Sequence, residues 1–147
     1  ITNPKCEGCF LCRYPSESDD KKNLILQRGK SAFVIMNFYP YNNGHLMVAP
    51  YQHTNDFAAL DDATHLELFH LVEKSVGILR ETLKAEGFNI GVNLGTVAGA
   101  GLKDHLHIHI VPRWTGDTNF MPVIGHTKVI SEGLTETWQK LKSKFDE

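Results

Sequence analysis

The stretch Asp104–Arg113 constrains the fold of this chain most strongly, because histidine and aliphatic residues alternate along it. His105, His107 and His109 stand at every second position. The aliphatic residues between and after them are Leu106, Ile108 and Ile110. In a β-strand successive side chains point to opposite faces, so the histidines would line one face and the aliphatic residues the other. The pattern predicts a strand with an apolar core on one side and a chemically functional site on the other.

Composition indicates an ordinary globular protein. Of the 147 residues, 41% are apolar and 22% are charged, and the formal net charge is -2. Domains of about 100–150 residues are the commonest, so we expect one domain over 1–147. Within it, 1–20 would be a cysteine-containing segment and 127–147 a tail and helix. Without a basic excess or an apolar run of roughly 20 residues, we expect a cytoplasmic protein that binds neither nucleic acid nor membrane.

The three cysteines Cys6, Cys9 and Cys12 lie close together and form two overlapping Cys-x-x-Cys pairs. An odd number of cysteines in a cytoplasmic protein argues against a framework of disulfides. The cluster suits a metal site, a redox pair or plain thiols, and a zinc ion would need two further ligands from elsewhere in the chain. The cysteines alone leave these alternatives open.

Short apolar runs predict β-strands at several places besides the histidine stretch. They lie near residues 24–27, 31–36, 45–49 and 89–94. The turn residues of Pro40–Gly44 favour antiparallel pairing of the two strands around them, because Asn and Gly tolerate positive φ. Residues 13–30 carry charge without periodicity and predict an exposed loop that leads into the first strand.

Residues 61–86 predict a long helix, because apolar residues recur there at steps of three and four. They are Leu66, Phe69, Val72, Val76, Leu79 and Leu83. Asp61 or Asp62 would cap its beginning and Gly87 would end it. A shorter helix is predicted after Ser131. Its apolar face comprises Leu134, Trp138, Leu141 and Phe145. Together these elements predict an α+β fold with a mainly antiparallel sheet of about five strands, one long helix and a C-terminal helix.

A glycine-rich loop, Gly95–Gly101, comes before the histidine strand. Its backbone N–H groups could hold phosphate oxygens, although a hairpin loop without a ligand can have the same composition. Burying three imidazoles without partners is costly, so the alternating histidines indicate function. Either they bind a catalytic zinc with an open position for water, or one imidazole is a nucleophile and its neighbours donate hydrogen bonds to a reacting phosphate.

The segment His105–Val111 reads His-φ-His-φ-His-φ-φ, where φ is apolar, and in this it resembles the histidine triad (HIT) family of nucleotide hydrolases and transferases. Further features in family order are Gly44–Pro50, His53, Ala98-Gly99 and Pro112-Arg113. The resemblance covers roughly residues 9–121 and implies a HIT-like fold. The tail at residues 112–121 looks most like the branch that includes diadenosine tetraphosphate phosphorylases and related hydrolases.

The resemblance implies a role for each residue of the site. His107 would attack the α-phosphorus and form a nucleotidyl-histidine intermediate, and His109 would hydrogen-bond the phosphate. His45 would fix the tautomers of the triad network. The remaining nucleotide contacts would come from Asn37 at the ribose, Ile35 and Phe38 at the base, and Asn93 with the N–H groups of Gly99, Ala100 and Gly101 at the phosphates.

The resemblance also implies a structural zinc ion held by Cys9, Cys12, His53 and His105, and no organic cofactor. The competing interpretation is a pair of reduced thiols, with His105 serving only in the hydrogen-bond network. The family further suggests a homodimer. Many relatives carry a glutamine or serine before the triad strand that can assist the leaving group, and this chain has Ala100-Gly101 instead. Proton delivery would then fall to Thr96, Lys103 or water.

The resemblance therefore predicts an enzyme that cleaves a nucleotide phosphoanhydride, such as a diadenosine polyphosphate, through covalent catalysis at His107. One alternative is a phosphoramidate (AMP-amine) hydrolase of the same family. Another is a zinc hydrolase in which the three histidines are ligands. A third is a nucleotide-binding module without catalysis. The choice between hydrolysis and phosphorolysis is open.

Overall fold

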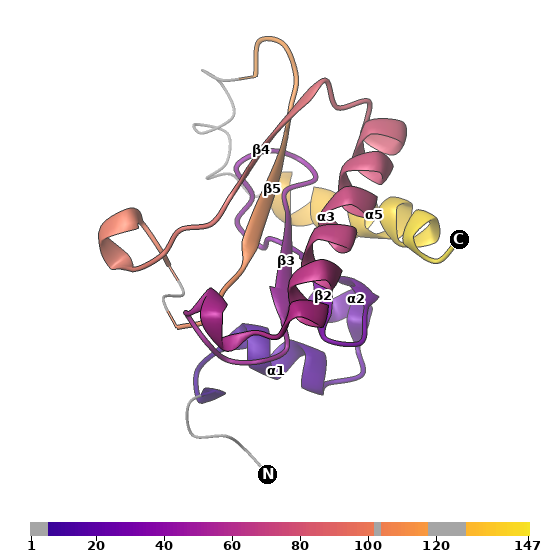
Figure 1. Cartoon of the computed structure of the whole chain (residues 1–147). Helices are drawn as coiled ribbons and strands as arrows, with labels where there is room; N and C mark the ends of the chain where they lie inside the picture. Colours follow the sequence, from indigo (N-terminus) through magenta and orange to yellow (C-terminus); the bar gives the residue numbers. More distant parts are fainter. Residues whose placement is uncertain (1–5, 102–103, 118–128) are drawn as a thin grey trace.

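The structure, a computed structural model, describes residues 6–101, 104–117 and 129–147, with side chains in the last stretch from residue 133 onwards. Within these residues an antiparallel sheet runs in the order β1-β2-β3-β5-β4 (Figure 1). The strands are β1 Ile25–Arg28, β2 Ala32–Met36, β3 Leu46–Pro50, β4 Gly87–Gly91 and β5 Ile108–Arg113. Every neighbouring pair is antiparallel, which confirms the predicted sheet.

Helices accompany the sheet in a way that confirms the predicted α+β class. They are α1 Phe10–Ser16, α2 Asp20–Asn23, α3 Asp62–Leu83 and α5 Val129–Phe145, with 3-10 turns at η2 Phe57–Ala59 and η3 Thr96–Ala98. The long α3 and the C-terminal α5 pack against each other and against the sheet (Figure 1). In the described part of the chain, no helix combines the length and apolarity that crossing a membrane requires.

The sheet buries side chains on both of its faces. In β2, Val34 and Met36 belong to a large apolar cluster that includes residues of α3 and α5. Phe33 and Ile35 belong to a second cluster on the other face, together with Cys9 and other residues of the N-terminal segment. All five residues of β2 are buried for this reason, and the sheet face that carries the second cluster also carries the triad histidines.

The β2–β3 hairpin confirms the predicted antiparallel pairing and brings His45 to the sheet. Met36 pairs with Leu46, so the intervening residues form the connecting loop. Gly44 has a φ of 82°, and a Cβ added there would lie 2.6 Å from a methyl group of Leu83. Only glycine fits both the positive φ and the close approach of α3, and His45 follows it directly.

Helix α3 begins as predicted, but the residues on its buried face differ from the predicted apolar set. The Asp61 carboxylate accepts a hydrogen bond from the N–H of Thr64, which is the geometry of an N-cap. The buried residues of the helix are Thr64, Leu68, Leu71, Val72, Ser75, Ile78 and Leu79. Leu66 and Phe69, which belong to the predicted apolar pattern, are instead 59% and 69% exposed.

The prediction that this helix continues to Glu86 and stops at Gly87 is wrong. The helix ends at Leu83, and Lys84 adopts a left-handed φ of 58°. The N–H of Glu86 already donates to the carbonyl of Arg113 in β5, so the chain has joined the sheet by this point. Gly87 is therefore the first residue of β4.

The predicted exposed loop before β1 is also wrong, because α1 and α2 occupy it. Asp19 caps α2 by accepting the N–H of Lys22. The Arg28 guanidinium donates to the carbonyls of Pro15 and Glu17 and forms an ion pair with Asp20. Because these contacts join residues 8 to 13 positions apart, no helical periodicity in the sequence indicates them. These contacts hold a charged, aperiodic segment in two short helices.

The C-terminal helix confirms the prediction, since Trp138, Leu141 and Phe145 are buried on one face. It begins at Val129, earlier than the predicted start after Ser131. Residues 118–121 of the tail at 112–121, and residues 127–128 of the predicted C-terminal tail, lie outside the described residues.

Candidate active site and metal centre

The triad segment combines a strand with the extended residues that precede it. Strand β5 begins at Ile108, so His109 lies within the strand while His105 and His107 lie before it. The aliphatic side is buried as predicted, with Leu106 at 4%, Ile108 at 7% and Ile110 at 0% exposure. The apolar anchoring of the segment is therefore confirmed, although the regular strand is shorter than predicted.

A chain of directed hydrogen bonds fixes the protons of two histidines. The backbone N–H of Tyr41 donates to Nδ1 of His45 over 3.1 Å, so this nitrogen carries a lone pair. The proton of His45 then resides on Nε2, which lies 2.9 Å from Nδ1 of His109 and donates to it. Nδ1 of His109 is thereby an acceptor, and the proton of this imidazole is left on Nε2. His109 consequently presents an N–H donor to the site.

Burial keeps both of these histidines neutral near pH 7. It lowers the pKa of His45 to about 3, with smaller contributions from the neighbouring His109 and His107. Burial likewise lowers the pKa of His109 to about 4, and His107 adds to this effect. Neutral imidazoles can be donor at one nitrogen and acceptor at the other, which the chain from Tyr41 to His109 requires.

In His107 the proton is on Nδ1, whereas in His45 and His109 it is on Nε2. Its Nδ1 lies 2.8 Å from the carbonyl oxygen of His105, and a carbonyl can only accept, so Nδ1 carries the proton. Nε2 of His107 therefore holds an available lone pair. The rings of His107 and His109 lie edge to face with centroids 4.8 Å apart. A nucleophilic nitrogen and an N–H donor thus occupy adjacent imidazoles.

Asn37 and Phe38, the predicted ribose and base residues, follow β2 on the side of His45. The Nδ2 atom of Asn37 lies 3.5 Å from Nε2 of His45, and its Oδ1 accepts the N–H of Tyr39. Phe38 is half-buried and contacts the ring of Tyr14 in α1. Ile35 is fully buried within the second cluster, so its side chain offers a base no exposed surface, because α1 and the neighbouring strands cover it.

The glycine-rich loop is an exposed loop that bonds to itself. It forms the 3-10 turn η3 and projects from the body of the molecule (Figure 1), and Val97 at its tip is fully exposed. The N–H groups of Gly99 and Ala100 donate to carbonyls within the loop itself. Gly101 is exposed and Thr96 lies in the turn, while Lys103 lies outside the described residues.

A cavity of about 470 Å³ adjoins His109 on the side of β4. Asn93 lines it, as do several residues that the sequence interpretation did not identify. These are Tyr41, Asn42, Asn89, Ile90, Gly91, Val111, Arg113 and Asp117. The missed signal was a period of two after α3, in which Asn89, Gly91 and Asn93 alternate with apolar residues.

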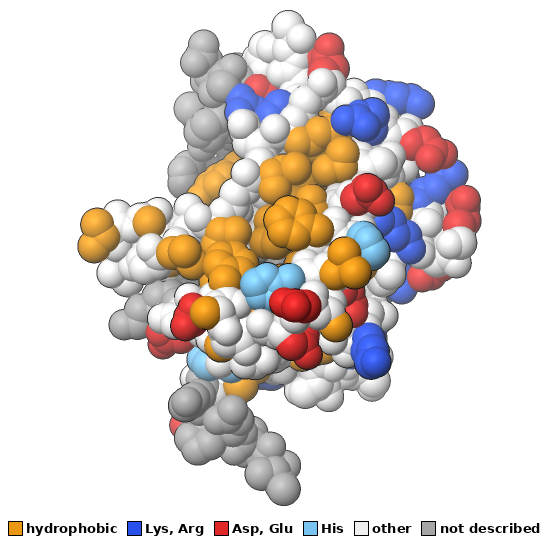
Figure 2. Space-filling model, viewed as in Figure 1, with side chains coloured by type: hydrophobic (Ala, Val, Ile, Leu, Met, Phe, Trp, Pro, Cys, Tyr) orange, Lys and Arg blue, Asp and Glu red, His pale blue; other side chains and the backbone are white. Residues whose placement is uncertain are grey.

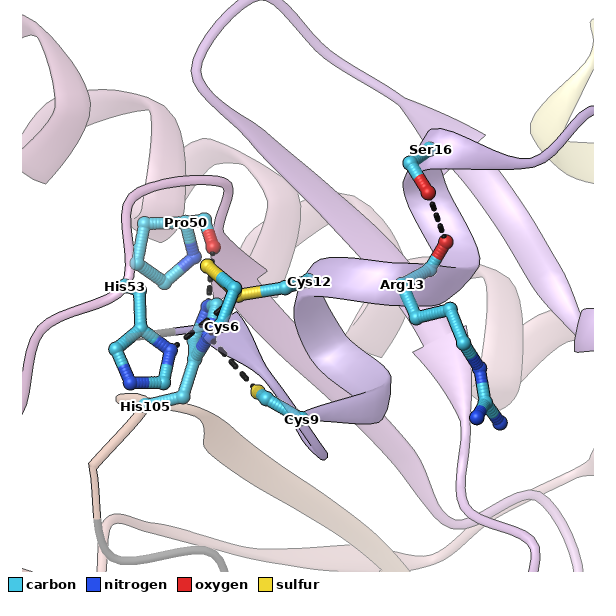
Figure 3. Close-up of a disulfide and its surroundings, with 8 residues drawn as sticks. All are labelled: Cys6, Cys9, Cys12, Arg13, Ser16, Pro50, His53 and His105. Atoms are coloured by element: carbon cyan, nitrogen blue, oxygen red, sulfur yellow. Dashed lines mark hydrogen bonds between the residues drawn. A yellow bond between two sulfur atoms is a disulfide. The ribbon is translucent and has the colours of Figure 1, made fainter. Parts of the chain in front are cut away.

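The predicted metal ligands come together from three distant segments (Figure 3). The ligand atoms of Cys9, Cys12, His53 and His105 all lie within 4.8 Å of one another. Nδ1 of His105 lies 3.4 Å from the sulfur of Cys9 and 3.5 Å from that of Cys12. Nδ1 of His53 lies 3.3 Å from the sulfur of Cys12. Bond lengths of about 2.0–2.3 Å around a tetrahedral zinc ion imply ligand separations of this size.

His105 has the orientation that metal-binding histidines usually have. Its Nε2 donates to the carbonyl of Pro50 over 2.8 Å, which leaves the lone pair on Nδ1, facing the two sulfurs (Figure 3). Burial lowers the pKa of this imidazole to about 4 and so keeps it neutral. Two cysteine sulfurs and two imidazole nitrogens are a donor set that suits zinc, and the residue types present fit such an ion.

The structure also joins Cys6 to Cys12 in a disulfide, which corresponds to the redox-pair alternative left open by the cysteine pattern. A turn before α1, in which the N–H of Cys9 donates to the carbonyl of Cys6, leads into the helix and leaves the Cα atoms of Cys6 and Cys12 5.7 Å apart, within the range that a disulfide spans. Cys9 remains free and buried. A disulfide-bonded Cys12 has no thiolate for a metal, so the disulfide and the four-ligand site exclude each other at this residue.

These features belong to a known family, and the chain is a member of it. The model of the HIT domain matches residues 18–116, which confirms the resemblance seen in the triad segment.

AP-4-A phosphorylase of Mycobacterium tuberculosis is 42% identical over 126 residues, or 86% of this chain and 65% of that protein. The chain thus spans just under two thirds of this relative's length. An uncharacterized HIT-like protein of Methanocaldococcus jannaschii is 31% identical over 134 residues, or 91% of this chain and 98% of that one. The crystal structure of a Zn-bound histidine triad family protein from Mycobacterium smegmatis matches with a TM-score of 0.75 at 25% identity, covering 95% and 94% of the two chains.

Proposed function

We propose that this protein is a nucleotidyl hydrolase or transferase that cleaves a phosphoanhydride bond of a dinucleoside polyphosphate through a covalent intermediate on His107. The observation that carries the proposal is the pair of fixed tautomers, with a lone pair on Nε2 of His107 and a proton on Nε2 of His109. The 42% identity to AP-4-A phosphorylase of Mycobacterium tuberculosis supports this choice of substrate class.

In the first step, Nε2 of His107 attacks the α-phosphorus and forms a P–N bond. The bond from phosphorus to the bridging oxygen breaks, and its electron pair leaves with the oxygen of the released polyphosphate. The N–H of His109 hydrogen-bonds a non-bridging oxygen and stabilises the charge that develops there. His45 contacts no reacting atom but holds His109 in the donor tautomer.

In the second step, water or inorganic phosphate attacks the phosphorus of the nucleotidyl-histidine and returns the bonding electrons to Nε2. A polyphosphate is a good leaving group without a proton, because phosphate oxygens remain ionised near neutral pH. Ala100 and Gly101 offer no acidic side chain, and this fits an activated leaving group.

Product analysis with diadenosine tetraphosphate tests the substrate assignment. Hydrolysis would give AMP and ATP, whereas phosphorolysis would give ADP and ATP when phosphate is added. The expected result is one of these product pairs, with turnover abolished in His107→Ala. Turnover of an AMP-amine substrate alone would favour the phosphoramidate hydrolase, and tight nucleotide binding without turnover would favour the binding module.

A zinc hydrolase that uses all three triad histidines as ligands fits the geometry less well. Nδ1 of His105 faces the cysteines, and Nδ1 of His107 donates to a carbonyl. We propose instead that zinc is structural and ties the N-terminal segment to the chain just before the triad strand. When bound, the ion would cross-link its four ligands and so stabilise the fold, and it would take no part in the reaction.

We also propose that the protein forms a homodimer through α3 and β4. Leu66 and Phe69 of α3 and Ile90 of β4 are exposed, and Figure 2 shows apolar side chains gathered over this part of the surface. An apolar cavity of about 280 Å³ lies among them. Strand β4 is the last of the described sheet, so a second copy could cover both its free edge and the apolar surface.

A further inference from the structure

We propose that the cavity over β4 and β5, beside His109, binds the second nucleoside of the substrate, the one that departs with the leaving group. This inference rests on the proposed cleavage of dinucleoside polyphosphates. It assigns a task to Asn89, Arg113 and Asp117, which that reaction scheme leaves unused.

The cavity lies on the opposite side of His109 from the residues expected to hold the first nucleoside. Across the sheet, Asn37 follows β2, His45 precedes β3, His109 lies on β5, and Gly91 pairs with His109 from β4. A substrate with its first ribose at Asn37 and its phosphate at His109 would extend its remaining half towards β4. The cavity begins at this point.

A glycine of β4, Gly91, keeps the cavity open beside His109. Gly91 pairs with His109, and directly paired residues point to the same face. A Cβ added to Gly91 would meet no atom within 4 Å. From His109 to Arg113 the strand spans four residues, or roughly 13 Å. The cavity of about 470 Å³ falls in the usual range for small-molecule sites, about 300–1,000 Å³.

The Arg113 side chain is fixed in place at the far end of the cavity. Its Nε and one terminal nitrogen donate to the two carboxylate oxygens of Asp117 over 3.0 and 2.8 Å, and its other terminal nitrogen donates to Asn89. Asp117 in turn accepts from the side chain of Asn42 and the N–H of Trp114. A guanidinium held in one plane in this way offers a flat face on which a base can stack.

The charge of the lining favours a nucleoside over a further phosphate. Among the lining residues that the structure describes, Arg113 carries the positive charge and Asp117 cancels it. Asn89 and Asn93 contribute amide groups, while Val111 and the exposed ring of Tyr41 contribute apolar surface. Amides, a flat cation and apolar walls match a neutral base and ribose.

The test compares two substrates that share the adenylyl half and the phosphate chain. Diadenosine tetraphosphate has the second nucleoside, and adenosine 5'-tetraphosphate lacks it. We expect the wild-type protein to have a kcat/KM at least tenfold higher for the dinucleotide. Asn89→Trp, which fills the cavity from an exposed strand position, should lower this ratio at least fivefold. Gln139→Trp, on the exposed side of α5, should keep the wild-type ratio.

Each outcome bears on the inference. A wild-type ratio near one overturns it without the need for any variant, and so does a ratio that Asn89→Trp leaves unchanged. If both substrates are turned over at similar rates, the cleavage reaction stands and only the second-nucleoside site falls. If neither substrate is turned over, the proposed function and this inference fall together.

Discussion

The substitution His45→Phe separates the proposed tautomer chain from simple packing. Phenylalanine keeps the ring and its approximate volume but can neither accept from Tyr41 nor donate to His109, so two hydrogen bonds are lost. Leaving a buried polar group without its partner costs about 1–3 kcal/mol. We therefore expect His45→Phe to lower the free energy of unfolding at pH 7 by about 2–4 kcal/mol.

The pH dependence of the free energy of unfolding provides a second, independent test of the role of His45. In the folded protein the pKa of His45 is about 3, against an ordinary value of 6.5, so the unfolded chain binds the proton more readily between these values. Stability is thus lost as the pH falls below 6.5, and this one group accounts for about 2 kcal/mol between pH 7 and pH 5. Phenylalanine does not titrate, so the stability difference between the two proteins should shrink by about 2 kcal/mol over that range.

Urea unfolding of both proteins at pH 7 and pH 5 measures these differences, with the exposed His70→Phe as the matched control. Turnover by His45→Phe should fall at least about tenfold, because about 1.4 kcal/mol of transition-state stabilisation is lost with the fixed donor on His109. A stability difference that is the same at pH 7 and pH 5, or full turnover by the variant, would refute the reasoning.

Three further predictions concern the metal, the ribose and the dimer. Purified under reducing conditions, the protein should contain about one zinc ion per chain by elemental analysis. The variant Cys12→Ser should lose this ion, and Cys6→Ser should retain it. A wild-type protein that is stable without metal would contradict the site. Asn37→Ala should raise KM for adenine nucleotides about tenfold while changing kcat less, and an unchanged KM would remove Asn37 from the ribose. Phe69→Glu should shift the protein from dimer to monomer in sedimentation, and a monomeric wild type would contradict the dimer.

Much of the fold can be predicted from the sequence, because the spacing of apolar residues and the residue types in turns determine strands and hairpins locally. The alternation of His109 with Ile108 and Ile110 predicts a strand, and Gly44 predicts the hairpin that precedes His45. The alternating histidines also predict a functional site, but the zinc ligand set and the separate role of each triad histidine follow only from the family resemblance. In the structure the Sγ atom of Cys9 lies 3.4 Å from Nδ1 of His105, although the two residues are 96 positions apart in the chain.

What the sequence could not predict depends on long-range contacts. Arg28 holds the segment of α1 and α2 through backbone carbonyls, which no periodicity reveals. The disulfide of Cys6 and Cys12 depends on how the chain turns before α1, and the cysteine pattern alone left a redox pair, a metal site and plain thiols as alternatives. The cavity beside His109 arises because β4 and β5 pair in one register, which places Gly91 and Asn89 beside the triad face.

The central claim is that His107 is the nucleophile, and trapping the intermediate tests it most directly. The protein is mixed briefly with diadenosine tetraphosphate, denatured without acid and digested, and the peptide that contains His107 is examined by mass spectrometry. We expect one adenylyl group on His107, absent in His107→Ala. Turnover without any adduct, or an adduct on another residue, would contradict it.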